Sequence, residues 1–384
     1  MNLFSPSGFF VLLVIGRLCG SEEKSFELTG ASIFYPPSNC SDHAYSARNV
    51  IATRLQIFRE RNAFLTLPKY KSGVPFSIGS MQMSSQSPPL VKPVLEDPKC
   101  RSCKADVVDC ADPQNVVDLA LDHTNDVLWA LDVGVVASLE RPNRECPPKI
   151  LGIGARTAKI VYRIDLSEVT TYRSRLQHLL VERSSGNRIH LYVSDAAVGA
   201  IIVHDVVADE LHRILLPRGV ASGCRGATQP DVLYLVRAIG KRNATSNAAA
   251  TSSSMIYFTY LCSDWLYAVE TSDLRRAKPG PFVHRVGAKD RKIILLGSDN
   301  GSSLFFRAKG QADVYAWNSE TSFEAENWQL VARGNDARLT THVVPASPTR
   351  NKVLWMIESN FHDYIKDALG TNGSSVVIRR VTRL

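Results

Sequence analysis

Short runs of large apolar residues recur along this chain, and their spacing constrains the fold more than any other feature of the sequence. In the clearest run, 128–134, Trp129 lies between aliphatic residues and Asp132 leads into a turn. Comparable runs begin at Phe64, Leu191, Ile256, Leu304 and Leu354, at intervals of roughly 50 to 65 residues. Strands repeated at this spacing are typical of a radial β-repeat. The six runs therefore predict a six-bladed β-propeller.

The stretches between these runs alternate short apolar segments with turns. Residues 116–122 and 127–132 are separated by a polar turn and predict one antiparallel pair, and 150–153 and 160–164 predict the next. No helical period is sustained for more than a few turns, so we expect an antiparallel all-β protein. Because the composition does not shift along the chain, we expect one propeller domain over residues 22–384.

The first residues predict export from the cell. Residues 8–16 form an uninterrupted apolar run, followed by the polar residues 21–24. Such a run is too short to span a bilayer and fits the core of a signal peptide, which we assign to residues 1–21. The alternative is a buried N-terminal strand. No later stretch reaches the length of a membrane span, so we expect a secreted, extracellular protein without a transmembrane segment.

The cysteines are compatible with an oxidising compartment. Of the eight, Cys19 lies in the predicted signal peptide, which leaves an odd number in the mature chain and at least one free or intermolecular thiol. We expect a structural disulfide within the group Cys100, Cys103, Cys110 and Cys146. Cys100 and Cys103 form a CxxC pair, but no second pair or histidine pair completes a zinc site. We therefore expect no metal and no cofactor.

Four sequons predict glycosylation of surface loops in a secreted chain. Their asparagines are Asn39, Asn243, Asn300 and Asn372. Asn243 lies in a stretch of low complexity at about 238–254, which is poor in bulky apolar side chains and predicts a surface loop.

The basic charge of the chain does not predict a nucleic-acid partner. The formal net charge is +8, but lysines and arginines are scattered, and the densest cluster is only 275–278. Nucleic-acid binding requires a basic stripe with interleaved aromatic residues, which the sequence lacks. We interpret the charge as a solvated basic surface.

Several stretches resemble the insect Yellow/major royal jelly protein family. Residues 64–75, FLTLPKYKSGVP, are similar to a signature of that family, and 127–134, VLWALDVG, resembles another. Further blocks follow in the family's order at 146–151, 191–195 with 201–205, 256–263, 299–306, 314–318 and 353–361. The resemblance extends over roughly residues 45–382 and implies a six-bladed propeller, in agreement with the repeated runs.

The chain departs from the family pattern at several positions. Lys69 and Tyr70 follow Pro68 where the family has Arg and Trp. Asn125 and Ala316 stand where the family usually has cysteines. The chain therefore resembles a divergent member, and the family's disulfides are not carried over to it.

The resemblance implies three classes of function. They are the binding of small aromatic amines in the central cavity, the conversion of dopachrome-type intermediates of the melanin pathway, and a structural or storage role in cuticle or secretion. The sequence contains no motif of a serine hydrolase, zinc protease, P-loop or dinucleotide-binding enzyme. None of the nine histidines is marked by its spacing as a general base. We therefore favour a non-enzymatic binder of biogenic amines or related catechols, with the tautomerase-type enzyme as the alternative.

The candidate ligand-binding residues follow strands of the propeller. The family's amine-binding region matches the block around Ser359, Asn360 and Phe361. Polar residues at other strand ends complete the set: Asp132, Asp195 and Asn318. The alternative for the two aspartates is that they close turns. A calcium site of the lactonase type would instead require convergence of Asp132, Asp195, Asp299 and Asn318.

Overall fold

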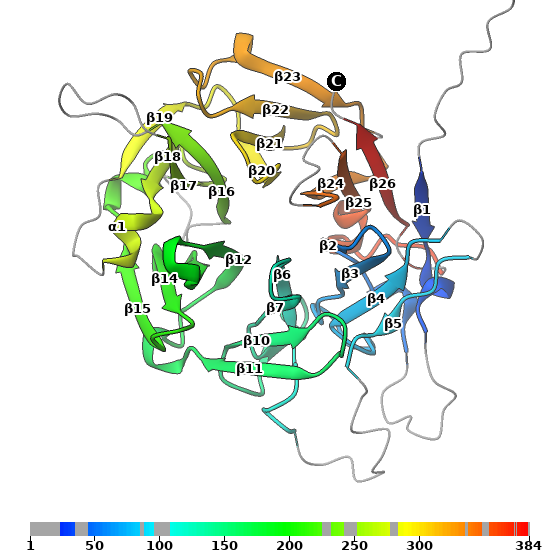
Figure 1. Ribbon diagram of the computed structural model, residues 1–384. Helices are drawn as coiled ribbons and strands as arrows, with labels where there is room; N and C mark the ends of the chain where they lie inside the picture. The colour runs from blue at the N-terminus through cyan, green and yellow to red at the C-terminus, as the bar shows by residue number, and fades with distance from the viewer. Residues whose placement is uncertain are drawn as a thin grey trace, which may run out of the picture.

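The computed structural model contains six four-stranded antiparallel sheets arranged in a ring (Figure 1). It describes residues 24–34, 45–84, 88–95, 108–224, 232–241, 252–276, 283–334, 337–347, 353–371, 373 and 375–382. The architecture is a six-bladed β-propeller, which confirms the predicted fold class.

Each of the first five blades is a continuous stretch of chain. Blade 1 is β2 (Arg54–Phe58), β3 (Asn62–Thr66), β4 (Ile78–Gln82) and β5 (Lys92–Pro93). Blade 2 is β6 (Val116–Asp122), β7 (Val127–Asp132), β10 (Lys149–Gly154) and β11 (Ile160–Asp165). Blade 3 is β12 (Leu176–Arg183), β13 (Ile189–Asp195), β14 (Ala200–Asp205) and β15 (Glu210–Leu215).

The last three blades complete the ring. Blade 4 is β16 (Leu233–Lys241), β17 (Ser252–Tyr260), β18 (Trp265–Glu270) and β19 (His284–Ala288). Blade 5 is β20 (Ile293–Ser298), β21 (Ser303–Ala308), β22 (Val314–Asn318) and β23 (Trp328–Ala332). Blade 6 is β24 (Leu339–Pro345), β25 (Val353–Ser359), β26 (Val376–Thr382) and, from the other end of the chain, β1 (Ser25–Leu28).

The smaller elements lie between these strands. They are β8 (Val135–Val136), β9 (Asn143–Arg144), α1 (Thr271–Arg275), α2 (Phe361–Ile365), and the 3₁₀ turns η1 (Gly30–Ser32), η2 (Ala47–Asn49), η4 (Ser167–Val169), η5 (Ser185–Asn187), η6 (Arg218–Ala221) and η7 (Ala325–Asn327).

Blade 6 closes the ring because it joins the two ends of the domain. Strand β1 pairs with β26 in antiparallel register from Ser25 to Leu28. The ring of Phe26 stacks on Trp355 of the same blade at a centroid distance of 6.1 Å. The ring therefore cannot open without unpairing a complete strand and exposing buried apolar surface.

The repeated apolar runs of the sequence are the second strands of the six blades. Strand β7 is buried along its whole length, because both faces of a blade pack against neighbouring blades. Trp129 is completely buried and packs on Tyr162 of the outer strand β11, with the ring centroids 5.1 Å apart. Trp317 and Trp355 are also buried. These tryptophans fill the space between blades.

The first strand of each blade lies at the centre of the ring. These inner strands are β2, β6, β12, β16, β20 and β24, and each contacts the next (Figure 1). They all begin on one face of the propeller, which we call the start face, and end on the opposite end face. Register places the last residue of a second strand at the start face: Asp132 pairs with Val116, and Ser359 pairs with Leu339.

The low-complexity loop is shorter than the sequence predicts. Strands β16 and β17 remain paired out to Lys241 and Ser252, and Ala238 is completely buried. Backbone hydrogen bonds extend the ladder without bulky side chains, which is why composition alone placed its boundary too early. Residues 242–251, with Asn243, lie outside the described part of the chain.

Two disulfides join segments that are distant in sequence. Cys110 and Cys146 form one, within the predicted group, and Cys224 and Cys262 form another that the sequence did not single out. Cys100, Cys103, Asn39, Asn372 and the signal peptide 1–21 lie outside the described residues. Asn300 is exposed in the turn between β20 and β21. Among the residues described, no helix is long and apolar enough to cross a membrane.

Candidate ligand-binding cavity

A cavity of about 110 Å³ lies between the inner strands of all six blades. This volume has room for on the order of seven to eleven water molecules. Its wall combines apolar residues of β6, β12 and β20 with a larger share of polar groups, which can fix the orientation of a bound molecule. The polar lining residues are Arg54, Gln56, Asp118, His123, His178, Arg237, Ser298, Asn300 and His342.

Arg54, Asp118 and His178 form the polar centre of this cavity. They come from three successive inner strands, β2, β6 and β12. Nε of Arg54 lies 3.4 Å from Oδ1 of Asp118, and Nη2 lies 3.0 Å from Nδ1 of His178. The Asp118 and His178 side chains are each only 6% exposed. The three blades thus bring together, near the start face, charged and polar groups that the sequence separates by more than fifty residues.

Backbone groups hold this centre rigidly. The Asp118 carboxylate accepts hydrogen bonds from the amides of Leu119 and Leu179, at 2.8 and 2.9 Å. Nη1 of Arg54 donates to the carbonyl of Thr341 in β24 at 2.8 Å. Because the bonds to Leu179 and Thr341 run between blades, the positions of the side chains depend on the closed ring.

Hydrogen bonding determines which nitrogen of each histidine carries the proton. Oδ2 of Asp118 lies 3.6 Å from Nδ1 of His178, which is longer than the Arg54 contact. A guanidinium only donates, so Nδ1 of His178 accepts and the proton of the neutral ring lies on Nε2. In His342, Nδ1 accepts from the amide of Leu55 at 3.2 Å, so its Nε2 is also the protonated nitrogen.

These two N–H groups are available to a ligand. Within the described residues, Nε2 of His178 is buried without a hydrogen-bond partner. His342 lines the cavity and is partly exposed, and the only hydrogen bond of its imidazole ring in the described part of the chain is the one at Nδ1. Of these two histidines, His342 is therefore the one placed to contact a bound molecule, and His178 lies behind Arg54.

Burial and the Arg54 charge keep both imidazoles neutral. They lower the pKa of His178 and lower that of His342 to about 3. Burial alone would raise the pKa of the Asp118 carboxyl, but the Arg54 guanidinium, together with the neighbouring His178 and His342, outweighs it and holds that pKa below its ordinary value. Near neutral pH the centre therefore contains one carboxylate, one guanidinium and two neutral imidazoles.

Stability is expected to fall as the pH drops from about 6.5 toward 3. The unfolded chain takes up a proton on His342 near pH 6.5, whereas the folded protein does so only near pH 3. The unfolded state therefore binds more protons in this window, so a falling pH stabilises it relative to the folded protein. Between about pH 7 and about pH 4.5, His342 contributes about 2–3 kcal/mol to the loss. Urea unfolding at both pH values should show that His342→Gln loses less unfolding free energy than wild type, by about the same 2–3 kcal/mol. Equal losses in the two proteins would contradict the lowered pKa of His342.

The residues expected from the family's amine site lie at the start face, beside the cavity. Ser359 is completely buried at the end of β25, and Asn360 precedes α2, where its amide donates to Asp363 at 2.9 Å. The ring of Phe361 packs edge-on against Tyr70 at 6.3 Å. Tyr70 in turn lies near Arg54 and Asp118: burial raises its pKa to about 12, while the Arg54 charge opposes that rise. The amine-site residues and the polar centre are therefore neighbours.

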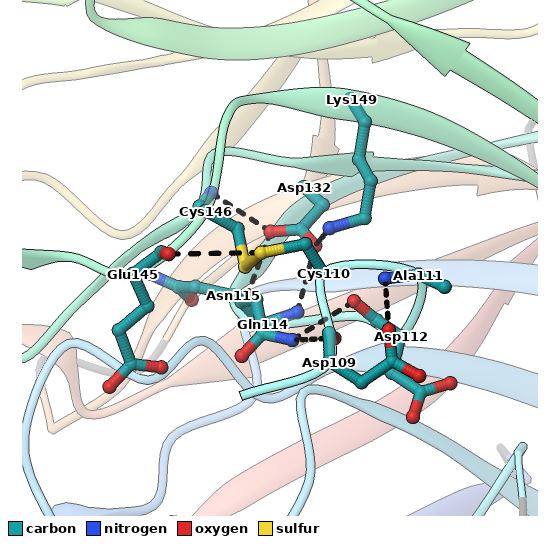
Figure 2. The surroundings of a disulfide bond; sticks show 11 residues. Asp109, Cys110, Ala111, Asp112, Gln114, Asn115, Asp132, Glu145, Cys146 and Lys149 are labelled. Carbon is teal, nitrogen blue, oxygen red and sulfur yellow. Dashed lines mark hydrogen bonds and ion pairs between the residues drawn. A yellow bond between two sulfur atoms is a disulfide. The ribbon is translucent and has the colours of Figure 1, made fainter. Parts of the chain in front are cut away.

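Asp132 is engaged in structural contacts (Figure 2). Its carboxylate accepts from the amides of Gln114, Asn115 and Gly134 at 2.8 to 2.9 Å. Nζ of Lys149, itself buried, lies 2.7 Å from Oδ2. The Cys110–Cys146 disulfide lies beside this network (Figure 2). These contacts match the turn-closing interpretation of Asp132.

Asp195 occupies the corresponding place in blade 3. It is completely buried at the end of β13, and Oδ1 accepts from the amides of Arg175 and Val198 at 2.9 and 3.3 Å. Like Asp132, it ties the end of a second strand to the segment that enters the inner strand. This repeated contact explains why an aspartate follows both apolar runs.

Asn318 and Asp299 lie on the other face. Asn318 ends β22, and its side chain accepts from the amide of Glu320 at 3.0 Å. Asp299 follows β20 and accepts from Gly301 and Ser303. Asp132 and Asp195 lie on the start face, so the four residues of the calcium alternative do not converge. Within the described ranges, no cluster of three or more His, Cys, Asp or Glu residues is arranged to hold a metal ion.

Fold and cavity define the class: a six-bladed propeller with a polar, donor-rich cavity between its inner strands. The family model described as "Major royal jelly protein" matches residues 114–382. The chain therefore belongs to the major royal jelly protein family.

Individual relatives are more distant. Over 155 residues the chain is 26% identical to the Dopaminechrome tautomerase of Drosophila melanogaster, a match that covers 39% of this chain and 33% of the relative. The matched region thus spans about a third of the length of that relative. Among solved structures, an α-L-arabinofuranosidase from Fusarium graminearum is 10% identical with a TM-score of 0.49, covering 92% of this chain and 98% of that one. An α-L-arabinanase from Penicillium chrysogenum is 10% identical with a TM-score of 0.47 over the same shares.

Proposed function

We propose that this chain is a secreted tautomerase that acts on aminochromes, the cyclic quinones formed when catecholamines are oxidised. The observation that carries the proposal is the set of N–H donors in the cavity: His342 and His178 are neutral imidazoles with protonated Nε2 atoms, beside the Arg54 guanidinium. The name of the Drosophila relative, Dopaminechrome tautomerase, supports the same reaction class.

The reaction needs only the movement of protons. A carbon of the five-membered ring loses a proton, the electron pair of that C–H bond moves into the ring system, and one quinone oxygen becomes a phenolate that is then protonated. The neighbouring ring carbon then loses a proton in the same way, and the second oxygen is protonated. The product is a dihydroxyindole, and no external oxidant or reductant takes part. Negative charge therefore develops on the ring oxygens, where preorganised N–H donors stabilise it. In this site the Nε2–H of His342 would donate to that oxygen, with its direction set by the bond from Leu55 to Nδ1.

His123 is the candidate base. It lines the cavity and follows β6 on the end-face side. Burial lowers its pKa, although Asp122 and Asp126 oppose the shift, so the ring is neutral and has a free lone pair at neutral pH. Asp118 is less suited to this role, because both of its oxygens accept backbone hydrogen bonds.

The proposal is tested with the full chain purified from the medium of insect cells. Aminochromes freshly prepared from dopa and from dopamine are mixed with the protein, and the loss of their visible absorbance is followed. We expect faster loss than in buffer or with heat-denatured protein, in proportion to protein concentration. An unchanged rate with both substrates would reject tautomerase activity.

Amine binding is the second candidate, and it has its own supporting observation. Oγ of Ser359 and Oδ1 of Asn360 are buried acceptors without a hydrogen-bond partner in the described part of the chain, next to the rings of Phe361 and Tyr70. An ammonium group would satisfy these oxygens, and the rings would contact its aromatic portion. Calorimetry with serotonin and dopamine tests this, with Phe361→Ala as the matched variant. If neither amine produces heat and no aminochrome is converted, a structural or storage role is favoured.

A further inference from the structure

Arg237 places an unpaired positive charge in the cavity. It lies in the middle of β16, and its side chain lines the cavity opposite the strands that carry Arg54 and Asp118. Within the residues described, its guanidinium takes part in no ion pair and donates no hydrogen bond to the protein. Arg237 is half-buried, so its guanidinium has lost part of its hydration, and no ion pair among the described residues compensates for that loss.

The nearest acid does not neutralise Arg237. Burial lowers the pKa of Arg237. The Glu182 charge opposes this shift only in part, so the pKa stays below its ordinary value. The Glu182 carboxylate is already held by the Tyr192 hydroxyl at 2.5 Å, the Thr271 hydroxyl at 2.8 Å and Nη1 of Arg275 at 2.6 Å. Its charge is therefore matched by Arg275 rather than by Arg237.

The rest of the cavity does not supply a counter-charge either. Arg54 is paired with Asp118, and the lining histidines are neutral near pH 7. Among the described residues that line the cavity, Asp118 is the one acidic side chain. Two guanidinium groups against one carboxylate leave the cavity with a net positive charge, which attracts anions and repels ammonium groups.

We propose that Arg237 is a specificity-determining residue that binds a carboxylate, so the preferred ligands are planar aromatic molecules bearing an acidic group. This inference rests on the proposed function for its substrate class, but the charge argument concerns binding and holds for a ligand that does not react. A guanidinium binds a carboxylate through two parallel charge-assisted hydrogen bonds, which a neutral ring substituent cannot replace.

The kinetic test uses two substrates that differ only in this group. The aminochrome of dopa carries a carboxylate, and the aminochrome of dopamine lacks it. Wild type should show a higher kcat/KM for the dopa-derived substrate. Arg237→Gln should lower that value about tenfold to a hundredfold and change the other by less than about threefold. Arg237→Lys should retain part of the preference, because it keeps the charge without the planar fork.

A binding test with unreactive ligands separates this inference from the proposed function. Calorimetry compares indole-2-carboxylate with indole, on wild type and on Arg237→Gln. Selective binding of the acid by wild type, lost in Arg237→Gln, supports the inference even if no aminochrome is converted. Absence of binding of the acid, equal binding of both ligands, or an equal decrease for both in the variant would overturn it. Arg237→Gln is expected to fold, because it removes a half-buried charge that has no ion-pair partner among the described residues, and circular dichroism checks this.

Discussion

Replacing His342 by alanine is expected to lower kcat/KM for aminochrome conversion by about 10²–10³. The reason is that the Nε2–H of His342 is the partly exposed donor of the cavity, held in one direction by the amide of Leu55. Without it, the negative charge that develops on the quinone oxygen loses a preorganised partner, and water that enters the cavity is a weaker substitute. His342→Gln should be intermediate, since its amide retains an N–H donor.

The matched control is His212→Ala. His212 lies on the outer strand β15, where Nε2 contacts the carbonyl of Leu274 at 3.0 Å, far from the cavity lining. Its activity should stay within about twofold of wild type, as expected for a site without contact with substrate. Initial rates are compared for proteins with matching circular dichroism spectra. A His342→Ala protein with full activity would exclude His342 from the reaction.

Replacing Asp132 by alanine is expected to destabilise the fold by about 3–5 kcal/mol. The substitution leaves the buried ammonium of Lys149 without its carboxylate and removes the acceptor for three backbone amides. Unpaired buried donors and charges carry their full desolvation cost. Asp132→Asn should be less damaging, because the amide oxygen still accepts part of these bonds. The change is measured as a shift of the urea midpoint with an unchanged slope.

Asp209→Ala is the control for this prediction. The Asp209 side chain is 93% exposed, and alanine is less favourable than aspartate at its left-handed backbone angle (φ 55°), so the substitution should cost less than about 1.5 kcal/mol, well below the Asp132 effect. Asp132 was also a candidate ligand residue from the sequence, and the two roles give different results. A variant with wild-type stability but weakened ligand binding would assign Asp132 to the ligand.

The sequence predicted the fold because the propeller repeats one physical requirement six times. Every second strand is packed on both faces, so each one needs a continuous apolar run such as 128–131, and the runs recur once per blade. The closing strand β1 lacked such a signal. It lies at the outside of blade 6 with alternate residues exposed, and only pairing with β26 defines it.

The polar centre had a weaker signal. Asp118 stands in the run VVDLALD and His178 in LQHLLV, each a polar residue near the beginning of an otherwise apolar inner strand. Aligning the starts of the inner strands would have placed Arg54, Asp118, His178 and His342 at one level of the cavity. Spacing along the chain does not reveal this, because turns and insertions of different length separate the blades.

The sequence by itself determined the all-β class, the number of blades and the family, because these depend on local periodicity and on collinear motifs. It also identified the group of cysteines that contains the Cys110–Cys146 pair. Only the tertiary structure decided which polar residues share a site. Closure of the ring brings Arg54, Asp118, His178 and His342 together from four inner strands, and it leaves Arg237 without an ion-pair partner in the part of the chain that the structure describes. Burial in that shared cavity then sets the charges: it keeps the histidines neutral and the cavity positive, and no residue spacing encodes this effect.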